Sequence, residues 1–88
     1  MLFDSHCHLD FDSLYGDLDG VLGRMAAADI AGCITISTRV EQFAKISAIA
    51  ERFDNVWCSI GTHPHNAAQE IHIETADLVR LAMHPKCV

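Results

Sequence analysis

Residues 33–60, CITISTRVEQFAKISAIAERFDNVWCSI, contain a strand, a helix and a second strand in succession, and this order decides the fold class. Cys33–Ser37 and Val56–Ile60 are short apolar runs with β-branched residues, which is typical of strands. Between them, apolar side chains recur at the spacing of one helix face, at Val40, Phe43, Ile46, Ala50 and Phe53. This succession predicts a βαβ unit with parallel strands.

The alternation extends toward the N-terminus. Leu2–Ser5 is a short apolar run that we expect to form a first strand. Asp17–Ile30 carries apolar residues at helical spacing and is expected to form the first helix. Gly32 is then the expected C-cap of that helix, because glycine commonly follows the last helical turn.

The alternation also extends toward the C-terminus. Residues 61–66 are expected to form a loop, because glycine and proline together interrupt regular structure. A helix is expected over Thr75–Met83, closed by Pro85. Lys86–Val88 is expected to begin a fourth strand.

The whole pattern predicts an α/β fold with three βα units, parallel strands and the start of a fourth strand. No Gly-x-Gly-x-x-Gly or Walker loop follows any strand, which disfavours the nucleotide-binding doubly wound folds. A closed (β/α)₈ barrel needs about 250 residues, and this chain has 88. We therefore expect the chain to be the first part of a larger protein.

Composition excludes several classes of protein. Half of the residues are apolar, which disfavours disorder, and the formal charge of −6 disfavours a polybasic surface for nucleic acid or membranes. No apolar run approaches the roughly 20 residues that span a bilayer, and the N-terminus lacks the features of a signal peptide, so a cytoplasmic location is expected. The four cysteines form no CxxC pair and are expected to be small buried side chains in a reducing compartment.

The first candidate site is Asp4-Ser5-His6-Cys7-His8-Leu9-Asp10, at the end of the first expected strand. Side chains alternate along a strand, so His6 and His8 should point the same way, with Asp4 in line and Cys7 packed on the other face. Two imidazoles about 6.5–7 Å apart on one face can converge on a divalent cation. Asp10 could orient an imidazole or serve only as a turn residue.

The second candidate site is Gly61-Thr62-His63-Pro64-His65, which again follows a strand. Pro64 should hold the two flanking histidines at defined angles. His63 could donate to an anionic oxygen or act as a general acid or base, and His65 is a weaker candidate for substrate contact. His72 is expected to be an exposed residue without a functional role.

Two histidines alone do not complete a catalytic metal site, which typically has three protein ligands. Paired-metal sites need bridging carboxylates as well. No other expected strand end in this chain offers an evident ligand, so the remaining ligands are expected outside it.

The two motifs at this separation, Asp4–Asp10 and Ile60–His65, resemble the TatD family of metal-dependent deoxyribonucleases, relatives of the amidohydrolase-type barrels. The similarity extends over the whole chain but covers only about the first third of the family's length. The resemblance implies a TIM-type (β/α)₈ barrel of which residues 1–88 are the N-terminal part of a single domain. It also implies a two-metal centre with Mg²⁺, Mn²⁺ or Zn²⁺, and hydrolysis of DNA phosphodiester bonds from the 3′ end of single strands.

By the same resemblance, His6 and His8 match the family's first two metal ligands, and His63 matches a histidine that meets the substrate phosphate. The family's bridging glutamate, later histidines and catalytic aspartate would lie beyond Val88, so this chain alone is expected to be inactive. No membrane and no obligate protein partner are expected. Two alternatives stay open, namely a related hydrolase acting on amides or esters and a small non-enzymatic metal-binding domain.

Overall fold

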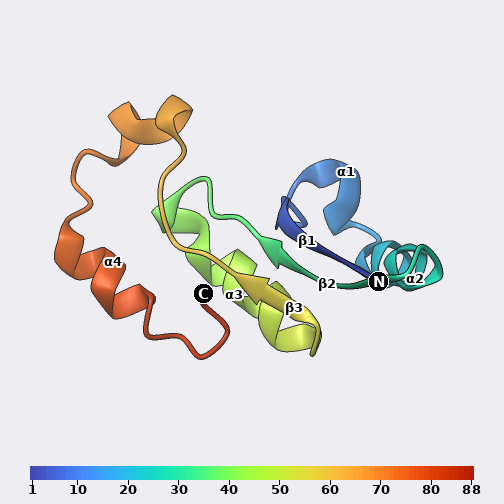
Figure 1. The fold of residues 1–88 in the computed structure, drawn as a ribbon. Helices are drawn as coiled ribbons and strands as arrows, with labels where there is room; N and C mark the ends of the chain where they lie inside the picture. Colours follow the sequence, from blue (N-terminus) through green and yellow to red (C-terminus); the bar gives the residue numbers. More distant parts are fainter.

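A computed structural model describes residues 1–88 and contains one parallel sheet. Its strands are β1 (Leu2–Cys7), β2 (Ile30–Thr35) and β3 (Val56–Cys58), in the order β1-β2-β3. Figure 1 shows the three strands side by side with a helical connection before each new strand. The expected βαβ arrangement with parallel strands is confirmed.

Helical segments connect the strands and follow the last one. The α-helices are α1 (Asp12–Tyr15), α2 (Leu18–Ala27), α3 (Phe43–Arg52) and α4 (Thr75–Leu81). Two 3₁₀ segments complete the helical structure, η1 (Val40–Gln42) and η2 (Pro64–Glu70). Figure 1 places α3 along β3, whereas α4 lies away from the three strands, at the left of the view.

The hydrophobic core lies between one face of the sheet and the helices α2 and α3. α2 contributes Leu18 and Val21, and α3 contributes a longer apolar face. The complete cluster is Leu9, Leu18, Val21, Cys33, Phe43, Ile46, Ile49, Ala50, Val56 and Cys58. These residues come from all three expected βα units, so the apolar periodicity in the sequence located the core correctly.

The opposite face of the sheet is not covered. Phe3, Ile34, Trp57 and Val88 line a shallow apolar hollow of about 270 Å³ on that face. Phe3 is 50% exposed, and its ring lies 5.8 Å from that of Trp57. One face of this sheet is therefore packed and the other is apolar but open.

The interpretation of Gly32 as a helix C-cap is wrong. α2 ends at Ala27, the chain reverses at Asp29 with a positive φ of 60°, and β2 already begins at Ile30. Gly32 lies inside β2, where an added Cβ would come within 2.6 Å of the Asn55 carbonyl oxygen. The glycine is needed for this close approach of two backbones, and not for a turn.

Two more features of the secondary structure differ from the sequence-based prediction. The predicted fourth strand is present only as a single parallel bridge between Cys58 and Cys87. The short helix α1 was not predicted, because Asp12–Tyr15 is too brief for helical periodicity to be visible.

All four cysteines are free thiols, as expected, and Cys33 and Cys58 are fully buried. Burial raises the pKa of Cys58 to about 11, which keeps its thiol protonated and unreactive. Cys7 packs against the core, and its thiol contacts the Ile34 carbonyl oxygen, in agreement with the expected packing. None of the helices combines the length and apolar character needed to cross a bilayer.

Candidate metal and phosphate site

The two N-terminal histidines lie where β1 ends. The register pairs Asp4 with Cys33 and Cys7 with Thr35, so β1 has one residue more than β2 over this stretch. This bulge puts Asp4 and Cys7 on the same face of the sheet, and Asp4 accepts a hydrogen bond from the backbone amide of His6 at 3.0 Å. The expected alignment of Asp4 with the histidines is therefore wrong, since strict alternation is interrupted.

The imidazoles of His6 and His8 do lie together. Their ring centroids are 5.2 Å apart with an interplanar angle of 81°. His8 Nδ1 lies 3.3 Å from the carbonyl oxygen of Ile36, and because a carbonyl can only accept, Nδ1 must carry the proton. In the neutral ring this leaves the lone pair on Nε2, the arrangement found in histidines that bind metals.

The chemistry of this pair fits a divalent metal but does not complete its coordination. No group of three or more His, Cys, Asp or Glu side chains is positioned to hold a metal ion in this chain. His6 and His8 can therefore supply two nitrogen ligands, and their role as metal ligands stays a prediction.

Asp10 lies next to these histidines in the sequence but makes no hydrogen bond to either ring. It is 5% exposed, and its Oδ1 is buried without a hydrogen-bond partner. Its backbone carbonyl accepts a hydrogen bond from Lys45 Nζ at 2.9 Å. The hydrogen bond that orients the His8 ring goes to the Ile36 carbonyl oxygen. An orienting role for Asp10 stays a prediction.

His63 and His65 lie at the start of η2, after the end of β3. The backbone amide of His63 donates to the Thr38 carbonyl oxygen at 2.8 Å, which ties this loop to the loop after β2. His63 Nδ1 accepts a hydrogen bond from the His65 amide at 3.0 Å, so the neutral His63 ring carries its proton on Nε2. The side chain can thus donate an N–H to an anionic oxygen.

The structure brings the two sequence motifs together in one surface hollow of about 500 Å³. Its lining consists of His8, Phe11, Thr38, His63, His65 and Asn66. None of these side chains is a carboxylate, and three are imidazoles, whose ring N–H groups can donate hydrogen bonds. This composition suits an anionic group such as a phosphate.

Sequence reasoning missed Glu70, which holds the loop after β3 against η1. Its side chain accepts hydrogen bonds from the backbone amides of Val40 at 2.8 Å and Glu41 at 2.9 Å, and from the Thr62 hydroxyl at 2.7 Å. Burial alone would raise the pKa of Glu70, but the hydrogen bonds from Glu41, Thr62 and Val40 and the charge of Arg39 hold it below its ordinary value. Glu70 is therefore an ionised, buried carboxylate that positions the residues before His63.

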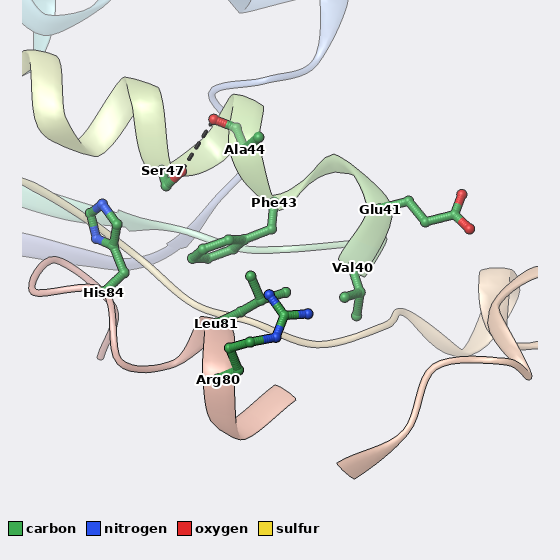
Figure 2. A pocket seen from close by; sticks show the side chains of 8 residues that line it. All are labelled: Val40, Glu41, Phe43, Ala44, Ser47, Arg80, Leu81 and His84. Carbon is green, nitrogen blue, oxygen red and sulfur yellow. Dashed lines mark hydrogen bonds between the residues drawn. The ribbon is translucent and has the colours of Figure 1, made fainter. Parts of the chain in front are cut away.

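The largest surface hollow of the molecule lies elsewhere. It measures about 550 Å³ between α3 and α4, and Figure 2 shows Phe43 and Leu81 facing each other across it, with Arg80 and His84 nearby. His84 is held by Glu51, with 2.6 Å between Nε2 and Oε1. This hollow contains none of the histidines of the two motifs, so its size does not make it the candidate site.

The fold and the site define a class of protein, an α/β domain whose polar residues lie at the carboxyl ends of parallel strands. The model of the family described as TatD related DNase matches residues 3–88, and the chain belongs to this family. The resemblance stated from the two motifs is confirmed.

Individual relatives agree with this assignment. The chain is 39% identical over 84 residues to the "Uncharacterized metal-dependent hydrolase YcfH" of Escherichia coli K12, covering 92% of this chain and 31% of that protein. It is 31% identical over 88 residues to the "3′-5′ ssDNA/RNA exonuclease TatD" of Citrobacter koseri, covering 99% of this chain and 34% of that protein. The chain thus spans about a third of the length of these relatives.

A solved structure also matches. The crystal structure of YjjV, a TatD homologue from Escherichia coli K12, superposes with a TM-score of 0.78 at 27% identity, covering 99% of this chain and 34% of that chain. The expected fold class is thereby confirmed as the first three βα units, with the start of a fourth strand, of a TIM-type (β/α)₈ barrel.

Proposed function

We propose that residues 1–88 are the N-terminal part of a single metal-dependent hydrolase domain that cleaves DNA phosphodiester bonds, from the 3′ end of single strands. The observation that carries the proposal is the carboxylate-free hollow in which His8 meets His63 and His65. An acidic chain with a formal charge of −6 needs such a local site, together with metal charge, to accept a polyanion. The relatives named as exonucleases support the choice of substrate.

In this proposal His6 and His8 hold divalent metal, with Mg²⁺, Mn²⁺ and Zn²⁺ as the candidate ions and two ions per site. Bound metal ions would lower the pKa of a water molecule that they bind, and they would neutralise charge on the phosphoryl oxygens. The Ile36 carbonyl oxygen keeps the His8 ring in the tautomer that leaves Nε2 open. Further ligands come from the part of the domain outside this chain.

His63 binds the substrate phosphate in this proposal. Its Nδ1 is engaged by the His65 amide, so Nε2–H is the donor that remains for a phosphate oxygen. The Thr38 carbonyl oxygen fixes the His63 backbone, which limits the reorganisation needed when the phosphate binds. His65, 4.6 Å from His63 between ring centroids, adds a second imidazole for the same anion.

The test is hydrolysis by the complete domain with added Mn²⁺, using a 3′-labelled single-stranded oligonucleotide beside a panel of small amides and esters. We expect release of the 3′ nucleotide, a fall in kcat/KM of about 10²-fold or more in His63→Ala, and no change in His72→Ala. His72 is the matched control because it is exposed and pairs only with Glu41. Cleavage of amides or carboxylic esters without loss of DNA would refute the nuclease and support the related hydrolase.

A further inference from the structure

Phe11 is an exposed aromatic residue that lies between two hollows. Its ring is stacked on that of His8, with centroids 4.5 Å apart and an interplanar angle of 9°, yet the residue remains 47% exposed. It borders the hollow of His8, His63 and His65, and it also borders a second hollow of about 470 Å³ that contains none of the histidines. Phe11 therefore forms a wall between the two.

The second hollow has a different chemistry from the first. Besides Phe11 it is lined by Asp10, Asp12, Ser13, Gln42 and Lys45. Lys45 is already engaged, since its Nζ donates to the Asp10 carbonyl oxygen and lies 4.1 Å from the centroid of the Tyr15 ring. The carboxylates of Asp10 and Asp12 would repel a second phosphate, whereas a neutral group with N–H donors would be accepted.

We propose that Phe11 is a stacking platform for a nucleobase, so that one nucleotide lies with its phosphate among the histidines and its base in the second hollow. The proposal rests on the function proposed above and names the part of the substrate that this chain recognises. One face of the ring is covered by His8, so the base stacks on the other face. Aromatic stacking accepts any base, while Ser13, Asp12 and Gln42 offer polar atoms to its edge.

The two hollows suit the two ends of a nucleotide in their charges as well. The phosphate end meets imidazoles and no carboxylate, and the base end meets carboxylates and amide or hydroxyl groups. A ligand with a negative charge at both ends would be repelled by Asp10 and Asp12 in the second hollow. A purely apolar ligand would leave the polar groups of that hollow unpaired. A nucleoside monophosphate unit has an anionic phosphate for the first hollow and an uncharged, polar base for the second.

The test compares binding of 2′-deoxyadenosine 5′-monophosphate and 2-deoxyribose 5-phosphate to the complete domain by calorimetry. The two ligands differ only in the base, and neither contains a phosphodiester bond to cleave. We expect the nucleotide to bind about tenfold more tightly in the wild type. Phe11→Leu should remove this difference without changing the affinity for the sugar phosphate, and Phe11→Trp should keep it.

Tyr15→Leu is the matched control, since Tyr15 is a similarly exposed aromatic residue, at 45%, that borders neither hollow. It should leave both affinities unchanged. Proton NMR of the nucleotide provides a second measurement, in which upfield ring-current shifts of the base protons should appear with the wild type and vanish with Phe11→Leu. Unchanged sugar-phosphate binding also reports that the variant is folded at the site.

The outcomes separate this inference from the proposed function. Equal affinity for the two ligands in the wild type overturns the base platform while leaving the phosphate site intact. An equal loss of both affinities in Phe11→Leu also overturns it, because the ring would then act only by orienting His8. Failure of the wild type to bind either ligand overturns the phosphate site and the platform together.

Discussion

The imidazole of His8 donates a hydrogen bond from Nδ1 to the Ile36 carbonyl oxygen, and the Phe11 ring covers one of its faces. A ring fixed in this way presents Nε2 in a single direction, which favours metal binding. We predict that His8→Ala lowers the Zn²⁺ affinity of the complete domain by at least about tenfold. Competition with a chromophoric chelator measures the affinity, and His72→Ala should not change it. Equal affinity in His8→Ala and the wild type would show that His8 is not a ligand.

Glu70 carries a second prediction at this scale. In Glu70→Gln one carboxylate oxygen becomes an NH₂ group that must face a donor, either the Val40 or Glu41 amide or the Thr62 hydroxyl. We expect a loss of about 1–3 kcal/mol in local stability, seen as faster hydrogen exchange of the Val40 and Glu41 amides.

Glu41→Gln is the control for this substitution, because Glu41 is exposed and its pairs with Arg39 and His72 lie at the surface. Such pairs contribute about 0–1 kcal/mol, so the effect should be small. Equal exchange rates in Glu70→Gln and the wild type would mean that the buried carboxylate does not hold η1 in place.

Glu70 also predicts a dependence on pH. Its pKa is lower in the folded chain than in the unfolded chain, where a glutamate titrates at about 4.3. The stabilisation is therefore fully present above that value and is lost as the pH falls through the lower, folded-state pKa. The backbone amide resonances of Val40 and Glu41 should titrate with a midpoint below about 4.3, and a midpoint above it would contradict this account.

Residue-scale features were predicted from the sequence only where a local motif carried them. His6 and His8 lie at the end of β1, and His63 and His65 come after β3, so the order of strands and the two short motifs are enough to find them. Glu70 has no such signal, because its three donors come from Val40, Glu41 and Thr62, and the first two lie about thirty residues earlier in the chain. A buried and an exposed glutamate look alike until the chain has folded.

Among the elements, β2 lies unusually close to the backbone of Asn55 at Gly32. An added Cβ would lie 2.6 Å from the Asn55 carbonyl oxygen and 3.0 Å from the Phe3 ring. The first of these contacts is backbone and cannot rotate away, so Gly32→Ala should force β2 away from the loop before β3. We predict a destabilisation of about 1–3 kcal/mol, measured by urea unfolding of the complete domain.

Gly23→Ala is the matched control, since Gly23 lies inside α2 with no heavy atom within 4 Å of the added Cβ. Alanine is the better helix former, so this substitution should stabilise by about 0.5–1 kcal/mol. A destabilisation of the same size in both variants would show that the close contact at Gly32 is not the cause.

Element boundaries were harder to predict than element types. The sequence predicted all three strands and the helices α2, α3 and α4, but β1 contains a bulge that no composition signal indicates. Gly32 was assigned to a helix end because glycine there is common, whereas a positive φ at Asp29 makes the turn. Local preference gave the wrong position because the packing of β2 against Asn55 determines where glycine is required.

At the scale of the whole molecule, one sheet face is covered and the other is open. The radius of gyration is 13.3 Å, whereas a compact chain of this length has about 12 Å, and the extents are 41 × 25 × 19 Å. Only 16 of the 88 residues are buried, which leaves a small core to stabilise the fold. In the YjjV crystal structure this portion makes up 34% of the chain, so the corresponding face there has further structure available to cover it.

These features predict how the 88 residues behave alone. We expect a broad thermal transition, because the core is small and the face with Phe3, Ile34 and Trp57 is exposed to water. The same face should bind the dye ANS, which reports exposed apolar surface. Phe3→Ser should reduce dye binding, whereas Ile71→Ser should not, since Ile71 is 85% exposed but lies outside this face.

The complete domain should unfold more sharply and bind less dye, because its remaining strands would cover Phe3 and Trp57. A single sharp transition of the 88 residues without dye binding would mean that they fold as a self-sufficient unit, and would contradict the account of an open apolar sheet face.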